Sequence, residues 1–140
     1  MTKEEITEGN LLIARFIGWQ DIKIDTLTTT KFKTTYVDGI ESPTGRILRL
    51  TEINSFLNYH ADWNLLMDVV DKIIEIDITP VPNWKGYRIE IVPRGYVGIT
   101  GFPMEPIYTN VSIEGSLVNA VYKAVLTFIK YYNSTNKIKS

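Results

Sequence analysis

Residues 116–133 (SLVNAVYKAVLTFIKYYN) carry the strongest folding signal in the chain, because their apolar side chains recur every three or four positions. This spacing places the apolar side chains on one face of a single amphipathic helix. The apolar positions are Leu117, Val118, Val121, Val125, Phe128, Ile129 and Tyr132, and the polar face carries Asn119, Lys123, Thr127 and Lys130. The pattern predicts how this segment folds but not what the protein does.

Two further helices are predicted upstream. Thr2 followed by Glu5 forms a capping-box pattern, and Gly18 stands where the first helix would end. Asp62 stands at the N-cap position of the second helix. Apolar residues at helical spacing are Ile6, Ile13, Phe16 and Ile17 in the first helix and Trp63, Leu66, Met67, Val70 and Ile74 in the second. We expect both stripes to lie in the core.

Strand signals occupy the stretches between these helices. Alternating residues predict two strands within 21–37, followed by a turn at Asp38-Gly39 and a third strand at 47–50. Further strands are predicted at 87–92, 96–100 and 108–113. The order predicts an α+β fold in which an antiparallel or mixed sheet is flanked by three helices. Residues 1–133 are expected to form a single domain, with 134–140 as a disordered tail.

Composition narrows the functional class. The chain has 140 residues, which suits one domain, and a formal net charge of -1 gives no electrostatic bias toward a nucleic acid polymer. No apolar run approaches the roughly 20 residues that span a bilayer, and the first eight residues are acidic rather than signal-like. With zero cysteines, disulfides, thiolate metal sites and cysteine nucleophiles are excluded. These features predict a cytoplasmic protein with no membrane partner.

Three segments resemble a known family. They are residues 10–19 (NLLIARFIGW), 59–73 (YHADWNLLMDVVDKI) and the closing helix 116–133. They are similar to N-x-L-I-A-x-F-M-G-W, F-H-x-S-W-D-W-L-M-P-V-V-E-K-I and S-K-I-E-A-V-W-x-A-V-V-E-F-I-K-W-Y-N in small phage and prophage proteins of Bacteroidetes-type hosts. The resemblance implies a phage protein with a fold like the small alpha-beta-alpha sandwich domains of phages. Departures at Asn64, Leu65, Asn119, Tyr122, Thr127 and Tyr131 remove acids and tryptophans from the family pattern, and Asp68 replaces its proline.

The sequence offers few catalytic groups. His60 is the only histidine, and its place just before the helix cap at Asp62 favours a capping or packing role over general-base catalysis. Asp68, Asp71 and Glu75 lie three and four residues apart, as expected for a solvated helix face. No motif with convergent metal ligands is present. We therefore expect no catalytic residue, no metal and no cofactor.

Two proline-rich segments, 79–86 (TPVPNWKG) and 101–108 (GFPMEPIY), carry aromatic residues where a plain connection would be polar. Such segments pack on a sheet edge or a second subunit, or they hold aromatic side chains ready to stack on a flat ligand. The guanidinium groups of nearby arginines can bind a phosphate group through two hydrogen bonds. Alternatively, Arg88 forms an ion pair with Glu90. The predicted ligand-binding residues are Trp84, Lys85, Arg88, Arg94, Tyr96, Phe102 and Tyr108.

These features predict a non-enzymatic phage binding protein, an anti-defence protein that sequesters a small nucleotide-like immune signal of the host. Affinity without turnover needs a rigid pocket and no catalytic group. The first alternative is a structural or regulatory interaction module that binds a host protein or forms a homo-oligomer. The second alternative is a small hydrolase that uses His60 with Asp62.

Overall fold

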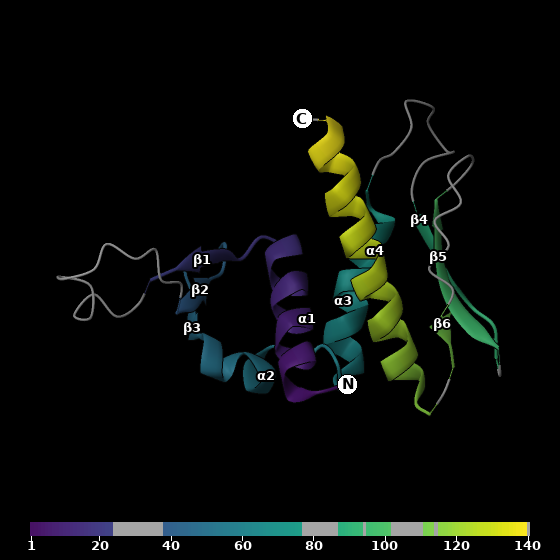
Figure 1. Cartoon of the computed structure of the whole chain (residues 1–140), viewed down its shortest axis with the longest axis horizontal. Helices are drawn as coiled ribbons and strands as arrows, with labels where there is room; N and C mark the ends of the chain where they lie inside the picture. The colour runs from purple at the N-terminus through teal and green to yellow at the C-terminus, as the bar shows by residue number, and fades with distance from the viewer. Residues whose placement is uncertain (24–37, 77–86, 94, 102–110, 114, 140) are drawn as a thin grey trace. The chain divides into compact units, whose positions relative to one another are not determined.

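The computed structural model describes residues 1–23, 38–76, 87–93, 95–101, 111–113 and 115–139. Within these ranges the chain combines α-helices with two three-stranded antiparallel sheets, which confirms the predicted α+β class (Figure 1). The chain forms two compact units, Met1–Asn58 and Tyr59–Ser140. Each unit contains one of the two sheets.

The first unit opens with helix α1, Lys3–Phe16. Thr2 is its N-cap, and the reciprocal hydrogen bonds of a capping box join the Thr2 hydroxyl to the Glu5 amide and the Glu5 carboxylate to the Thr2 amide. The helix ends before Gly18, whose φ of 112° lies in the left-handed region that favours glycine. Both predicted ends of this helix are confirmed.

The sheet of the first unit contains β1 (Gln20–Ile22), β2 (Gly39–Glu41) and β3 (Ile47–Arg49) in the order β1-β2-β3. The predicted turn at Asp38-Gly39 is wrong, because Gly39 begins the central strand and pairs with both neighbours. The turn lies instead at 42–45, where the Gly45 amide donates to the Ser42 carbonyl and Gly45 has a φ of 92°. The predicted strand residues 24–37 lie outside the described residues.

A short helical segment that the sequence did not predict follows β3. It consists of the 3₁₀ helix η1 (Leu50–Glu52) and helix α2 (Ile53–Phe56), which packs on α1. Buried Asn10 of α1 donates from Nδ2 to Oδ1 of Asn54 at 2.9 Å, and Asn54 Nδ2 donates to the Thr7 hydroxyl at 2.8 Å. A chain of side-chain hydrogen bonds therefore connects α2 to α1.

The second unit begins with helix α3, Trp63–Ile74, capped by the Asp62 carboxylate, which accepts from the Leu65 amide at 3.0 Å. The predicted cap is confirmed, but two of the predicted core positions are wrong. Trp63 is 39% exposed and Ile74 is 44% exposed. The buried arc is centred on Leu66 and Ile73, and at 3.6 residues per turn Trp63 and Ile74 fall roughly 70 and 90° away from that centre.

The sheet of the second unit contains β4 (Tyr87–Ile91), β5 (Tyr96–Gly101) and β6 (Val111–Ser112) in the order β4-β5-β6. Because strand residues alternate between faces, Tyr87, Val97 and Ile99 share one face, and all three are buried. Helix α4 packs on β5 and β6, and α3 contacts β4 and α4. In Figure 1 both helices lie on the same side of this sheet.

Helix α4 runs from Leu117 to Lys139, and the Ser116 hydroxyl accepts from the Asn119 amide at its start. The helix is buried on most sides between Ala120 and Ile129, where only Lys123 and Thr127 are exposed. The predicted helix end at Asn133 is wrong, because α4 continues for six more residues. Residues 134–139 contain neither glycine nor proline, so nothing in the local sequence stops the helix.

Candidate ligand-binding site

Two of the seven predicted ligand-binding residues, Arg88 and Tyr96, belong to the described residues, and both lie in the β4–β5 hairpin. The other five, which are Trp84, Lys85, Arg94, Phe102 and Tyr108, lie outside the described residues. Arg88 is exposed and Tyr96 is half-buried. The site is therefore built from these two side chains and their neighbours.

The strand register places Arg88 and Tyr96 on the same face of the sheet but not side by side. Arg88 is paired with Thr100, which is four residues from Tyr96 along β5. At about 3.3 Å per residue, the two positions are separated by roughly 13 Å along the strands. The structure thus puts both residues on the face opposite buried Tyr87, but at different ends of the hairpin.

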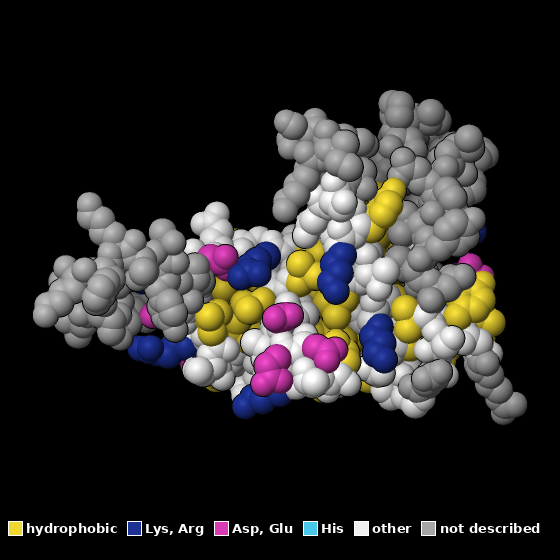
Figure 2. Space-filling view, viewed as in Figure 1, with side chains coloured by type: hydrophobic (Ala, Val, Ile, Leu, Met, Phe, Trp, Pro, Cys, Tyr) yellow, Lys and Arg dark blue, Asp and Glu magenta, His cyan; other side chains and the backbone are white. Residues whose placement is uncertain are grey.

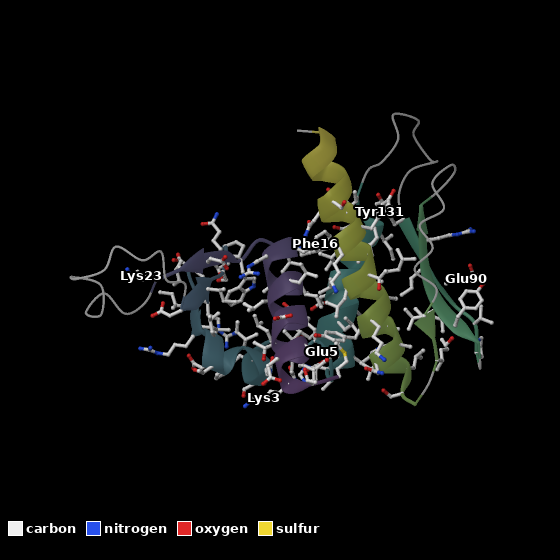
Figure 3. All side chains as sticks on the ribbon, in the orientation of Figure 1. Lys3, Glu5, Phe16, Lys23, Glu90 and Tyr131 are labelled. Atoms are coloured by element: carbon white, nitrogen blue, oxygen red, sulfur yellow. The ribbon has the colours of Figure 1, made fainter. Side chains whose placement is uncertain are left out.

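Glu90 lies between these two positions on the same face. The Tyr96 hydroxyl donates to Glu90 Oε1 at 3.4 Å, a long hydrogen bond in an exposed setting. In Figure 3 the labelled Glu90 lies on the side of the sheet that faces away from α4. A carboxylate in this position disfavours a continuous anion site that would run from Arg88 to Tyr96.

One end of the sheet gathers the remaining predicted features. Tyr87 is the first residue of β4 and Gly101 is the last residue of β5, and the two are direct cross-strand partners. The chain segments 77–86 and 102–110 therefore both join the sheet at this end. Arg88 is one residue from the same end, whereas Tyr96 begins β5 at the opposite end.

An aromatic cluster that the sequence did not assign to the site lies at this end of the sheet. The Phe128 ring meets the Tyr87 ring edge-on, with centroids 4.7 Å apart, and stacks on the Tyr132 ring at 5.9 Å. Tyr87 and Phe128 are buried, and Tyr132 is half-buried. The four-residue spacing of Phe128 and Tyr132 predicted that they share a helix face, but no sequence signal linked them to Tyr87.

The His60 ring packs against α4, and Asp62 is the N-cap of α3. The His60 ring meets the Tyr122 ring edge-on at a centroid distance of 6.1 Å. Desolvation by burial lowers the pKa of His60, so the imidazole is neutral at pH 7. Asp62, the proposed partner in a hydrolase, already uses Oδ1 to accept the Leu65 amide proton as the helix cap. The packing role predicted for His60 agrees with this geometry.

Tyr59 and Tyr122 are buried, and the pKa of each phenol is raised. Burial, with a smaller contribution from the negative charge of Asp68, raises the pKa of Tyr59 to about 12. Burial also raises the pKa of Tyr122. Both groups stay protonated at neutral pH, because the surrounding apolar side chains disfavour a phenolate. They serve the core as neutral aromatic side chains and offer no base at pH 7.

The carboxylates of α3 form a solvated face, as predicted. Asp68, Asp71 and Glu75 are all exposed. Over the described residues, no group of three or more histidine or acidic side chains is placed to hold a metal ion.

Figure 2 shows basic and acidic side chains interspersed over α1 of the first unit. The described part of the chain also has no helix that is both long and apolar enough to cross a membrane.

Comparison with known proteins gave no match to a family model, to a curated protein or to a solved structure.

Proposed function

We propose that this chain is a phage-encoded, non-enzymatic binding protein that sequesters a nucleotide-derived immune signal in the cytoplasm of an infected or lysogenic bacterium. The phage context comes from the three segments that resemble phage and prophage proteins. The ligand class comes from the chemistry at one end of the second sheet. The proposal therefore combines a sequence resemblance with a local arrangement of residues.

The observation that carries the proposal is the pairing of Tyr87 with Gly101. It brings the attachment points of both proline-rich, aromatic segments to the same end of the sheet as exposed Arg88. A guanidinium group binds phosphate oxygens through two parallel hydrogen bonds, which suits a nucleotide phosphate. Trp84, Phe102 and Tyr108 supply the aromatic rings that would stack on the base.

The pairing of β4 with β5 limits the proposed site to one end of the hairpin. Arg88 and the segments at its end of the hairpin form the proposed pocket, with Lys85 as the second cation. Tyr96 begins β5 at the opposite end, so a ligand that used it would have to extend over the face occupied by Glu90. We therefore assign Tyr96 a secondary place in the proposal, whereas Arg94 lies outside the described residues.

Binding without turnover is testable by ligand release. The purified protein is incubated with a panel of cyclic nucleotides and ADP-ribose-derived nucleotides, washed, and heated to release the bound molecule for chromatography. Return of the intact nucleotide supports sequestration. Return of an altered nucleotide supports the hydrolase alternative with His60 and Asp62, and no retained nucleotide contradicts both readings.

The role of Arg88 is tested by Arg88→Ala against the matched control Lys130→Ala, which removes an exposed cation from α4. Loss of a charge-assisted phosphate contact should weaken binding about tenfold or more and reduce the dependence of affinity on salt concentration. The control should change neither. Equal affinity of both variants and the unmodified protein would remove Arg88 from the site.

A protein–protein interaction module is the second candidate, and a specific observation favours it. Several large apolar side chains are exposed among the described residues: Met1, Ile47, Phe56, Trp63, Ile74, Ile91 and Leu117. Isolated exposed apolar residues are common on monomers, so the oligomeric state decides whether any of these side chains belongs to an interface. Light scattering with and without nucleotide separates the candidates. An oligomer that Trp84→Ala converts to monomer, with no effect of nucleotide, favours the interaction module.

A further inference from the structure

Strand β4 forms an open edge of the sheet in the second unit. It is the outer strand in the order β4-β5-β6, so one of its sides has no strand neighbour within that sheet. With five residues, β4 is the longest edge strand in the part of the chain that the structure describes. The open side of such a strand presents amide and carbonyl groups that can pair with another strand.

The hydrogen bonds of the β4–β5 hairpin show which backbone groups lie on the open side. The Val92 amide donates to the Tyr96 carbonyl, so these two residues are a hydrogen-bonded pair. Such pairs alternate along antiparallel strands, and Glu90 and Arg88 therefore also direct their backbone groups toward β5. The positions that direct their backbone groups away from β5 are Tyr87, Ile89 and Ile91.

Two of these outward positions are open for pairing. The outward amide and carbonyl groups of Ile89 and Ile91 have no hydrogen-bond partner among the described residues. Each position offers one donor and one acceptor on the same side of the strand. The edge therefore supplies two donors and two acceptors to an incoming strand, with Tyr87 as the next outward position.

The inner face of the sheet is less covered at this edge than at its centre. Val97 and Ile99 of the central strand are 0% and 1% exposed. On β4, Ile89 is half-buried and Ile91 is 38% exposed. A strand added beside β4 would cover apolar side chains that the helices leave partly open to solvent.

The outer face of β4 carries two opposite charges. Arg88 and Glu90 are both exposed and flank Ile89 on either side. Figure 3 shows Glu90 on the side of the sheet that faces away from α4. The Tyr96 hydroxyl donates to Oε1 of Glu90, whereas Oε2 has no partner among the described residues. This order of a cation, an apolar residue and an anion is complementary to itself when the strand direction is reversed.

We propose that β4 pairs with β4 of a second copy of this chain, antiparallel and centred on Ile89, so that the two sheets form one continuous sheet. Ile89 of each copy would exchange both backbone hydrogen bonds with Ile89 of the partner subunit. Tyr87 would lie opposite Ile91 of the partner subunit on the inner face. Arg88 would lie opposite Glu90 of the partner subunit on the outer face, twice in the dimer because of its two-fold symmetry.

Charge selects this alignment over its neighbours. The outward groups must meet outward groups, so the centre of the pairing can move by one residue in either direction. Centring on Arg88 would place two guanidinium groups opposite each other, and centring on Glu90 would place two carboxylates there. Like charges directly opposite each other destabilise a strand pair. The pairing also uses up both open edges, so association ends at two copies.

The proposal does not depend on the nucleotide site. A guanidinium group has five N–H donors, and a two-bond contact with a carboxylate leaves three of them for another ligand. The two proposals share Arg88, so the experiment includes a variant that affects them differently.

Reversal of each charge tests the pairing. In the dimer, Arg88→Glu places carboxylates opposite each other, and Glu90→Arg places guanidinium groups opposite each other. Each variant should dimerise about tenfold or more weakly than the unmodified protein in sedimentation equilibrium. Lys130→Glu, which reverses an exposed charge on α4, is the control and should not change dimerisation.

Two combinations should restore association. In an equimolar mixture of Arg88→Glu and Glu90→Arg, one copy carries two negative charges at the edge and the other carries two positive charges, so a heterodimer should form. The double variant that exchanges both residues keeps the self-complementary pattern and should dimerise like the unmodified protein. Because it moves the cation away from position 88, loss of nucleotide binding with an intact dimer would separate the two proposals.

Introduced cysteines test the alignment, because the chain has none of its own. Arg88→Cys mixed with Glu90→Cys should give a disulfide-linked heterodimer under mild oxidation, since directly opposite residues at such positions have Cα atoms about 4.5 Å apart. Neither variant should cross-link with itself. Identical positions would be offset by two residues and lie about 8 Å apart, which is too far for a disulfide.

The proposal is overturned if the unmodified protein stays monomeric up to millimolar concentration, or if both reversed variants dimerise as tightly as it does. Failure of the reversed variants to associate with each other would also overturn it. Far-UV circular dichroism verifies folding. If a reversed variant does not fold, the cysteine pair decides, because a missing heterodimer cross-link or self-linkage of Arg88→Cys rules out the pairing centred on Ile89.

Discussion

At the scale of single residues, Phe128 and Trp63 were both predicted to be core residues, but they differ in burial. Phe128 is fully buried and contacts Tyr87 and Tyr132, whereas Trp63 is 39% exposed. Phe128→Ala should lower the free energy of unfolding by about 3 to 5 kcal/mol, because it leaves a cavity. Trp63→Ala should cost about 1 kcal/mol. Urea denaturation measures both, and equal losses would contradict the assignment.

Asn10 provides a second residue-scale prediction. Asn10→Ala removes the donor to Asn54 Oδ1 in a part-buried setting, so it should destabilise the first unit by about 1 to 3 kcal/mol. Thr7→Val keeps the side-chain shape and removes the acceptor at the other end of the same chain of hydrogen bonds. Because Thr7 is less buried than Asn10, its change should cost less. Thermal unfolding of the two variants tests this order.

His60 predicts a pH dependence. Its folded-state pKa lies below 6.5, so the unfolded chain binds a proton more readily than the folded chain in the interval between the two values. The stability that neutral His60 contributes is fully present above pH 6.5 and is lost as pH falls through the folded pKa. His60→Gln should remove this acid-side slope in the free energy of unfolding. An unchanged slope between pH 6.5 and 5 would assign it to other groups.

At the scale of elements, the helix caps are the most local determinants of the fold. Thr2→Ala and Asp62→Ala each remove a side-chain acceptor from the first turn of a helix, α1 and α3 respectively. Each should lower stability by about 1 kcal/mol. Asp62→Ser keeps an acceptor at the cap and should restore most of the loss. If Asp62→Ser and Asp62→Ala melted at the same temperature, capping would not be the role of Asp62.

At the scale of the whole molecule, the two buried tyrosines whose pKa values are raised, Tyr59 and Tyr122, set an alkaline limit on stability, and both lie in the unit Tyr59–Ser140. The folded-state pKa of Tyr59 is about 12, against 10.0 for the ordinary group. The stability that protonated Tyr59 contributes should be fully present below pH 10 and should be lost as pH rises toward 12, because the unfolded chain loses its phenolic proton first. Tyr59→Phe should reduce this slope. An alkaline slope that is the same in Tyr59→Phe and in the unmodified protein would contradict it.

The sequence alone predicted the features whose causes are local. Both upstream caps, the stop at Gly18, the strand at Tyr87–Ile91 and the α+β class are confirmed, because each depends on hydrogen bonds or spacing within a few residues. The turn at Asp38-Gly39 was wrong for the opposite reason. A dipeptide suited to a turn also fits a central strand when two partner strands satisfy its backbone.

Tertiary structure decided which faces and which distant segments meet. Periodicity identified the apolar arc of α3 but not its centre, since the exposure of Trp63 and Ile74 depends on what packs against the helix. The candidate site shows the same division. Residue type marked Arg88 and Tyr96 as candidates, but the antiparallel register placed them at opposite ends of one hairpin. The packing of α4 on the sheet brought Phe128 to Tyr87. Contacts between residues far apart in sequence follow from chain pairing, which no local pattern encodes.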